Sequence, residues 1–146
     1  MFGIVTKNMF FDSQKVMNAT DRATRRVLSK FGAFVRRGAK SSIGKRKRVS
    51  DPGQPPSSHT GLLKKLILFG YDASRQSVVI GPMKLSGREN KDAPEVAEYG
   101  GTAKRIFTIR KKRTVKNVKY KARPFMRPAL EREEPKLPAM WADSVK

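Results

Sequence analysis

Residues 16–40 read VMNATDRATRRVLSKFGAFVRRGAK, and this stretch decides the fold. Its apolar residues recur at steps of three and four positions, which is the period of one helix face: Val16, Ala19, Ala23, Val27, Phe31, Phe34, Val35 and Ala39. Most of the Arg and Lys residues of the stretch fall outside this stripe. We therefore predict a long amphipathic helix from Ser13 to about Ile43, with its apolar face in the core and a basic outer face.

Two glycines, Gly32 and Gly38, interrupt the second half of this predicted helix. Each costs about 1 kcal/mol relative to Ala in a helix interior. They mark either a close helix crossing or a weakening of the far end of the helix. A helix lying on a membrane surface is the rival interpretation, but the pattern favours a helix that packs in a core.

The helix is followed by a basic loop that is rich in proline. Residues 44–58 read GKRKRVSDPGQPPSS and begin with four consecutive cations, Lys45, Arg46, Lys47 and Arg48. Proline restricts its own backbone and that of the preceding residue, so we expect an extended loop. The four cations either contact phosphates or form a solvated patch.

Two segments rich in Leu, Ile, Val and aromatic residues come next, after a helical start at residues 60–63. Residues 65–71 and 76–82 have the length and composition of strands, and residues 72–75 supply a turn between them. The pattern predicts an antiparallel hairpin.

A second hairpin is predicted over residues 102–121, after one or two helical turns at residues 94–101. It is strongly basic, with its tip near residues 111–114, and it carries the cations Arg110, Lys111, Lys112, Arg113, Lys116 and Lys119. A two-stranded hairpin is rarely stable alone. We therefore expect this basic arm to pack on the sheet or on a neighbouring subunit.

The remaining residues, 122–146, are predicted to form a C-terminal helical segment. Pro128 suits the first helical position, Glu131 would lie in the first turn, and Pro135 and Pro138 interrupt or kink the helix. The whole chain, 1–146, is predicted to be one α+β domain. In it a long N-terminal amphipathic helix packs on a small antiparallel sheet, with extended basic loops, a hairpin arm and a short C-terminal helix.

Charge is unevenly distributed along the chain. The 33 Lys and Arg residues against 12 Asp and Glu residues give a formal charge of +21. Residues 1–50 carry +11, residues 51–100 carry 0 and residues 101–146 carry +10. Repulsion on this scale indicates a polyanion or an acidic partner nearby, nucleic acid first, although a merely basic surface is the alternative.

Few residues are suited to catalysis or to metal binding. The chain has no cysteine and one histidine, His59, and it lacks the glycine spacings of nucleotide-binding loops. Glu95 and Glu98 are spaced like surface charges on a helix. We predict neither an enzyme nor a cofactor, and keep a small RNase toxin that acts through Lys, Arg and Tyr as a remote alternative.

No signal peptide and no apolar run of membrane-spanning length are present in the sequence. We expect a soluble protein that is made in the cytoplasm and has no membrane partner.

The run ARPFMRPALE at residues 122–131 resembles the signature ARPFLRPALE near the C-terminus of a phage tail-component family, which includes neck and tail-completion proteins. Three weaker landmarks follow the same order as in that family: TGLL at residues 60–63, VIGP at 79–82 and EYGGT at 98–102. His59 stands where the family often has an acidic residue, and the two basic segments are longer than in many relatives.

This resemblance implies a structural virion protein of a tailed double-stranded DNA phage. Six or twelve copies would form a closed ring in the neck, next to connector, tail-terminator or tail-tube proteins, and would surround the DNA without sequence preference. We expect the loop and the arm to reach neighbouring subunits or to line the DNA passage. The rival is a basic nucleic-acid-binding protein of chromosomal or ribosomal type.

Seven residues near the signature are candidates for the subunit or partner interface: Arg123, Phe125, Met126, Arg127, Leu130, Glu98 and Tyr99. Phe125, Met126 and Leu130 are expected to anchor the C-terminal helix on the sheet. Arg123 and Arg127 are expected either to pair with carboxylates such as Glu98 or to face DNA.

Overall fold

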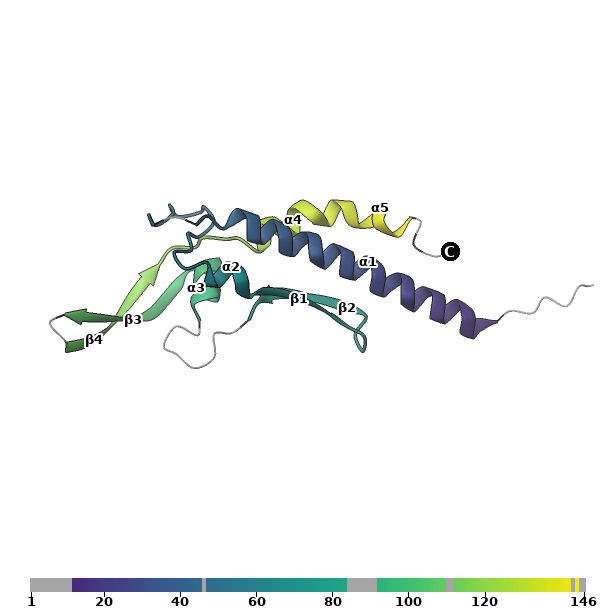
Figure 1. The fold of residues 1–146 in the computed structure, drawn as a ribbon, viewed down its shortest axis with the longest axis horizontal. Helices are drawn as coiled ribbons and strands as arrows, with labels where there is room; N and C mark the ends of the chain where they lie inside the picture. Colours follow the sequence, from purple (N-terminus) through teal and green to yellow (C-terminus); the bar gives the residue numbers. More distant parts are fainter. Residues whose placement is uncertain (1–11, 46, 84–91, 110–111, 143, 145–146) are drawn as a thin grey trace, which may run out of the picture.

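A computed structural model describes residues 12–45, 47–83, 92–109, 112–142 and 144, and it has the predicted mixed α+β architecture. One long helix, α1 (Ser13–Ser42), runs through the molecule. The β1–β2 hairpin lies along one side of α1, and the helices α4 and α5 lie along the other side (Figure 1). The β3–β4 hairpin projects from the end of the molecule where α1 finishes.

Helix α1 follows the predicted stripe from its third turn onward. The carboxylate of Asp12 accepts a hydrogen bond from the backbone N–H of Lys15 (3.1 Å) and caps the start of the helix. The buried residues of the helix are Ala23, Val27, Phe31, Gly32, Val35, Gly38 and Ala39. Val16, which belongs to the same stripe, is 48% exposed because the first turns extend beyond the β1–β2 hairpin.

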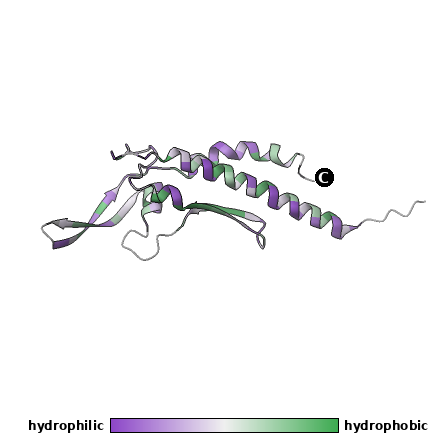
Figure 2. Ribbon diagram, in the orientation of Figure 1, coloured by the Kyte–Doolittle hydropathy of each residue, from purple (hydrophilic) through white to green (hydrophobic). Residues whose placement is uncertain are grey.

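The first hairpin consists of β1 (Ile67–Asp72) and β2 (Ser77–Pro82), which pair from Ile67–Pro82 to Asp72–Ser77. The first strand was predicted to begin at residue 65, two residues before its observed start at Ile67, so the predicted start is wrong. A short helix, α2 (Leu62–Leu66), occupies that position, because Gly61 has a left-handed backbone (φ 74°) that begins a helical turn. Figure 2 shows that this hairpin is largely hydrophobic.

The single predicted sheet is in fact two separate two-stranded sheets among the described residues. Helix α3 (Ala93–Tyr99) leads into the second hairpin, formed by β3 (Gly101–Ile109) and β4 (Lys112–Tyr120). Ile109 pairs with Lys112, so the predicted tip at residues 111–114 is too late. Residues 112–114 belong to the strand, and residues 110–111 lie outside the described part of the chain.

The C-terminal segment is α4 (Arg127–Glu133), a 3₁₀ turn (Glu134–Lys136) and α5 (Leu137–Trp141). Its predicted position on the sheet is wrong, because both α4 and α5 pack on α1. Pro128 occupies the second helical position rather than the first, and Glu131 lies beyond the first turn. As predicted, the helix is interrupted near Pro135, because proline has no backbone N–H with which to continue the hydrogen-bond pattern.

The core is one cluster that joins α1, β1, α4 and the segment before α4. Its buried members are Phe31, Val35, Ala39, Ile43, Ile67, Phe125 and Ala129. The guanidinium of Arg36 donates a hydrogen bond from Nε to the backbone oxygen of Ile67 (2.8 Å), which fixes the end of α1 to the first strand. No helix in the described ranges is long and apolar enough to cross a membrane.

Both helix glycines are points of close approach, but the predicted helix crossing is found only at Gly38, which faces α4, whereas Gly32 faces the β1–β2 hairpin. An ideal Cβ at Gly32 would lie 2.7 Å from Val78 Cγ2 and 3.0 Å from Phe69 Cδ2. At Gly38 it would overlap the guanidinium of Arg132, at the far end of a flexible side chain, and would lie 3.5 Å from Ala129 Cβ. The first site therefore has less freedom to adjust than the second.

We predict opposite effects for alanine at these two positions. Each substitution improves helix propensity by about 1 kcal/mol. Gly32→Ala overpacks the hairpin contact at a cost of about 1–3 kcal/mol, so we expect net destabilisation. Gly38→Ala only displaces the end of Arg132, so we expect a neutral or stabilising effect. Urea unfolding of the full chain measures both free energies, and equal stabilisation by the two variants would contradict the packing described for Gly32.

Candidate functional site

A buried carboxylate connects α3 to the start of α4. Glu98 is 8% exposed, and its two oxygens accept hydrogen bonds from three consecutive backbone N–H groups, those of Phe125 (2.8 Å), Met126 (3.0 Å) and Arg127 (2.8 Å). N–H groups at the start of a helix have no partner within that helix. The charge-assisted bonds to Glu98 therefore supply this cap from another element.

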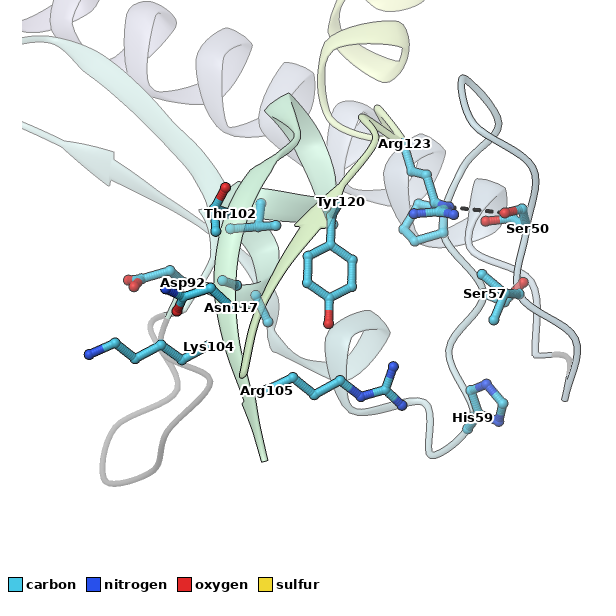
Figure 3. A pocket seen from close by; sticks show the side chains of 16 residues that line it. Ser50, Ser57, His59, Asp92, Thr102, Lys104, Arg105, Asn117, Tyr120 and Arg123 are labelled. Atoms are coloured by element: carbon cyan, nitrogen blue, oxygen red, sulfur yellow. Dashed lines mark hydrogen bonds between the residues drawn. The ribbon is translucent and has the colours of Figure 1, made fainter. Parts of the chain in front are cut away.

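Arg123 connects the same segment to the basic loop 44–58. Its Nε donates to the backbone oxygen of Ser50 (3.0 Å), as Figure 3 shows, and its Nη1 donates to the backbone oxygen of Lys121 (3.3 Å). The Arg123 backbone N–H also donates to the oxygen of Ala97 in α3 (2.7 Å), and Gly53 N–H donates to the Ala122 oxygen (2.9 Å). The segment before α4 is thus held by α3 on one side and by the loop on the other.

Pairing with a carboxylate was one of two alternatives for the side chains of Arg123 and Arg127, and among their described contacts neither side chain pairs with Glu98. Glu98 accepts only backbone N–H groups among its described contacts, while Arg123 donates to carbonyl oxygens. The side chain of Arg127 is exposed, and its Nε lies 3.9 Å from Oε1 of Glu131 in the same helix. A run of Arg and Pro in sequence gives no sign that a distant glutamate binds the backbone between them.

The seven predicted interface residues separate into internal and external groups. Glu98 and Phe125 are buried within the chain, and Met126 packs partly against the core, so these three serve the fold of one subunit. Tyr99 is 74% exposed and Leu130 is 42% exposed, and both remain accessible to a partner. Leu130 does not anchor α4, because Ala129 is the residue of this helix that belongs to the core cluster.

Those predicted cations that the structure describes lie at one end of the molecule. Lys45, Lys47 and Arg48 are exposed in the loop that follows α1, and Lys112, Arg113, Lys116 and Lys119 are exposed along β4. Arg46, Arg110 and Lys111 lie outside the described residues. Both basic segments are therefore near the end of α1 from which the β3–β4 hairpin projects (Figure 1).

A groove of about 800 Å³ separates the loop from the base of the β3–β4 hairpin. Its lining includes the apolar residues Val96 and Ala97 and the cations Lys104, Arg105 and Arg123. Figure 3 shows Tyr120 and Arg105 on the side of the hairpin, and Ser57 and His59 on the side of the loop. The groove thus combines apolar contacts with positive charge, and Asp92 is the one carboxylate residue that lines it among the residues the structure describes.

Two cations of β3 in this region were not singled out by the sequence. Lys104 and Arg105 are both exposed, and their side chains leave the strand in opposite directions (Figure 3). The guanidinium of Arg105 lies 5.2 Å from the centre of the Phe107 ring, a cation–π contact. The alternation of side chains along a strand places these two cations on opposite faces, but the denser run of cations at 110–113 gives a stronger signal in the sequence.

Three cations lie close together where α1 approaches α2. Burial, followed by repulsion from Arg36 and Lys64, lowers the pKa of Lys40. In the part of the chain that the structure describes, no group of three His, Cys, Asp or Glu side chains is arranged to hold a metal ion. The candidate site is the cationic surface of the loop and the β3–β4 hairpin, and the hydrogen bonds of Glu98 and Arg123 hold these segments in place.

Comparisons of the chain with known protein families, with curated proteins and with solved structures find no match.

We predict that Glu98→Gln destabilises the fold. A glutamine has one acceptor oxygen in place of two, and its amide would place a donor against the backbone N–H groups. The expected loss is about 2–3 kcal/mol in the free energy of unfolding, because a buried donor is left without its charged partner. Glu95→Gln, on the exposed side of the same helix, is the matched control and should change stability by less than about 0.5 kcal/mol. Equal urea midpoints for the two variants would rule out the capping role.

A second prediction concerns acid stability. The hydrogen bond from Lys136 is the main factor that lowers the pKa of Glu133, with further contributions from the charges of Lys136 and Arg132 and an opposing effect of burial. A lowered pKa in the folded state adds stability above the ordinary value of 4.5, and this stability is lost as the pH falls through the lowered pKa.

Glu133→Gln should therefore flatten the decrease of the urea midpoint between about pH 7 and pH 3. Some decrease should remain, because hydrogen bonds from Ser74 and Arg75 also lower the pKa of Asp72. An unchanged pH profile in the variant would show that Glu133 is not coupled to folding.

Proposed function

We propose that the protein is a structural subunit of a tailed double-stranded DNA phage. In this proposal it forms a closed ring in the neck that completes the tail or joins it to the head. The observation that carries the proposal is a hairpin that the described part of its chain leaves largely uncovered. Seven of the nine residues of β4 are exposed, and β3 and β4 pair only with each other among the described strands. A two-stranded hairpin of this kind normally requires packing against something else.

The internal framework supports the resemblance on which the proposal draws. Two of its landmarks, the segment that contains Glu98 and the signature at residues 122–131, are in direct contact through three hydrogen bonds. Side chains in the signature have separate tasks: Arg123 holds the loop, Phe125 fills the core and Ala129 packs near Gly38 of α1. A run in which several positions have structural tasks is more informative than a match of surface residues.

The surface offers several apolar contacts for neighbouring subunits. Tyr99 and Leu130 are exposed, as are Leu68 and Val79 on the side of the β1–β2 hairpin that faces away from α1. These positions belong to different faces of the subunit, as a ring requires, because head-to-tail contacts join two unlike surfaces. In the assembled particle, adjacent connector, tail-terminator or tail-tube proteins would cover the remaining faces.

The positive charge fits a passage for DNA. A subunit with a formal charge of +21 repels its own copies unless a polyanion or acidic neighbours offset the charge. Packaged DNA in the centre of the ring would do so through contacts to phosphates, which carry no sequence information. Among the partners considered, DNA and the chain itself are the two that the described surface supports best.

Sedimentation velocity of the full chain tests this proposal. We expect a species with the mass of six or twelve subunits. Combining Tyr99→Ser with Leu130→Ser should shift the population toward monomers while leaving the urea midpoint nearly unchanged, since both side chains are exposed in the subunit. A wild-type protein that stays monomeric and coats DNA or RNA would instead favour the rival, a basic nucleic-acid-binding protein.

A further inference from the structure

The β3–β4 hairpin carries exposed cations on both of its faces. Side chains alternate between the two faces of a strand. The register of the hairpin therefore separates its six described cations into two sets of three: Arg105, Lys112 and Lys116 on one face, and Lys104, Arg113 and Lys119 on the other. All six are exposed, and the described residues of the hairpin, 101–109 and 112–120, include neither Asp nor Glu.

The dimensions of this basic ribbon are set by its pairing. Nine residues of each strand are paired, from Gly101–Tyr120 to Ile109–Lys112, so the ribbon is about 30 Å long. Adjacent strands are separated by about 4.8 Å, and a sheet with its side chains is about 10 Å thick. No third strand pairs with either edge in the described part of the chain.

A ligand that matches this ribbon has negative charge on two facing walls. A channel lining or a flat contact with a polyanion would use the cations of one face only. The major groove of B-form DNA is about 12 Å wide and admits a two-stranded ribbon, whereas the minor groove is about 6 Å wide. Phosphates border both sides of the groove, so each face of the ribbon would meet one backbone.

The composition of the ribbon favours DNA over a protein partner. Four of its six cations are lysines, Lys104, Lys112, Lys116 and Lys119, and lysine is depleted from the cores of protein interfaces. The Phe107 ring is already in contact with the guanidinium of Arg105. Compact, strongly hydrated ammonium groups are instead suited to phosphate contacts that do not depend on sequence.

We propose that the β3–β4 ribbon inserts edge-on into the major groove of duplex DNA, with one face directed toward each phosphate backbone. This inference rests on the proposed function, which supplies duplex DNA as the polyanion, but it can be tested separately from ring formation. The proposed contact is made to phosphates and not to base edges, so it would hold DNA of any sequence.

The salt dependence of duplex DNA binding by the full chain tests the use of both faces. Each phosphate contact adds about 0.9 to the slope of log K against log salt concentration. Replacing Arg105, Lys112 and Lys116 with Gln should reduce the magnitude of this negative slope by about 2.7. Replacing Lys104, Arg113 and Lys119 with Gln should reduce it equally. A loss with only one of the two triple variants would mean that the ribbon lies flat, and would overturn the proposal.

Matched controls separate this contact from a general effect of charge. Replacing Arg22, Arg25 and Arg26 with Gln removes the same charge from the exposed side of α1 and should leave the slope nearly unchanged. Exchanging Arg and Lys within each triple keeps the charge and should also keep the slope. An equal loss in the α1 variant would assign binding to the whole surface and overturn the proposal.

Methylation of bound DNA by dimethyl sulfate identifies the groove. The reagent modifies guanine N7, which lies in the major groove, and adenine N3, which lies in the minor groove. We expect protection of guanine N7 alone. Protection of adenine N3 alone, or tighter binding to an RNA duplex, whose major groove is deep and narrow, would contradict the proposal.

Sedimentation of each variant without DNA keeps the two proposals distinct. If both triple variants lose slope while the wild-type protein remains monomeric, the ribbon contact holds and the ring proposal fails. If rings form while neither triple variant alters DNA binding, the ring proposal holds and the ribbon contact fails.

Discussion

The carboxylate of Glu98 is the interaction on which the rest of the structure depends. It binds three backbone N–H groups that begin 27 residues later in the chain, at Phe125. Between these two points the chain leaves the core, forms β3 and β4, and returns. The clamp at Glu98, reinforced by the Arg123–Ala97 backbone bond, therefore closes the base of this excursion and fixes the direction of the hairpin relative to α1. A hairpin that has little packing of its own acquires a defined position in this way.

The molecule separates a small apolar interior from an extended basic exterior. The interior lies along one helix: α1, which supplies Phe31, Val35 and Ala39 to the core, contacts the first hairpin on one side and α4 on the other. Gly32 and Gly38 allow these two neighbours to approach closely. Most of the positive charge lies outside this core, in segments that gain little from burial. Such a division suits a protein in which a small core stabilises the subunit and the basic segments contact neighbouring molecules.

Periodicity predicted most of the individual helices and strands. The long helix, the first hairpin and the basic hairpin were all expected, because three- and two-residue spacings are visible directly. Contacts between distant elements were not predictable in this way: Glu98 looked like a surface charge, and the C-terminal helix was expected on the sheet rather than on α1. The exposed Val16 and Leu130 illustrate the same limit, since a stripe of apolar residues predicts a face but not whether another element covers it.

We propose that this chain is completed by copies of itself around DNA, with the signature at residues 122–131 stabilising each subunit and the basic segments directed to partners. Electron microscopy of the purified full-length protein tests it most directly. The account predicts closed rings with a central channel, and with the β3–β4 hairpin of each subunit in contact with a neighbour or directed into that channel. Single subunits in which the hairpin contacts nothing, at concentrations where the fold is intact, would contradict it.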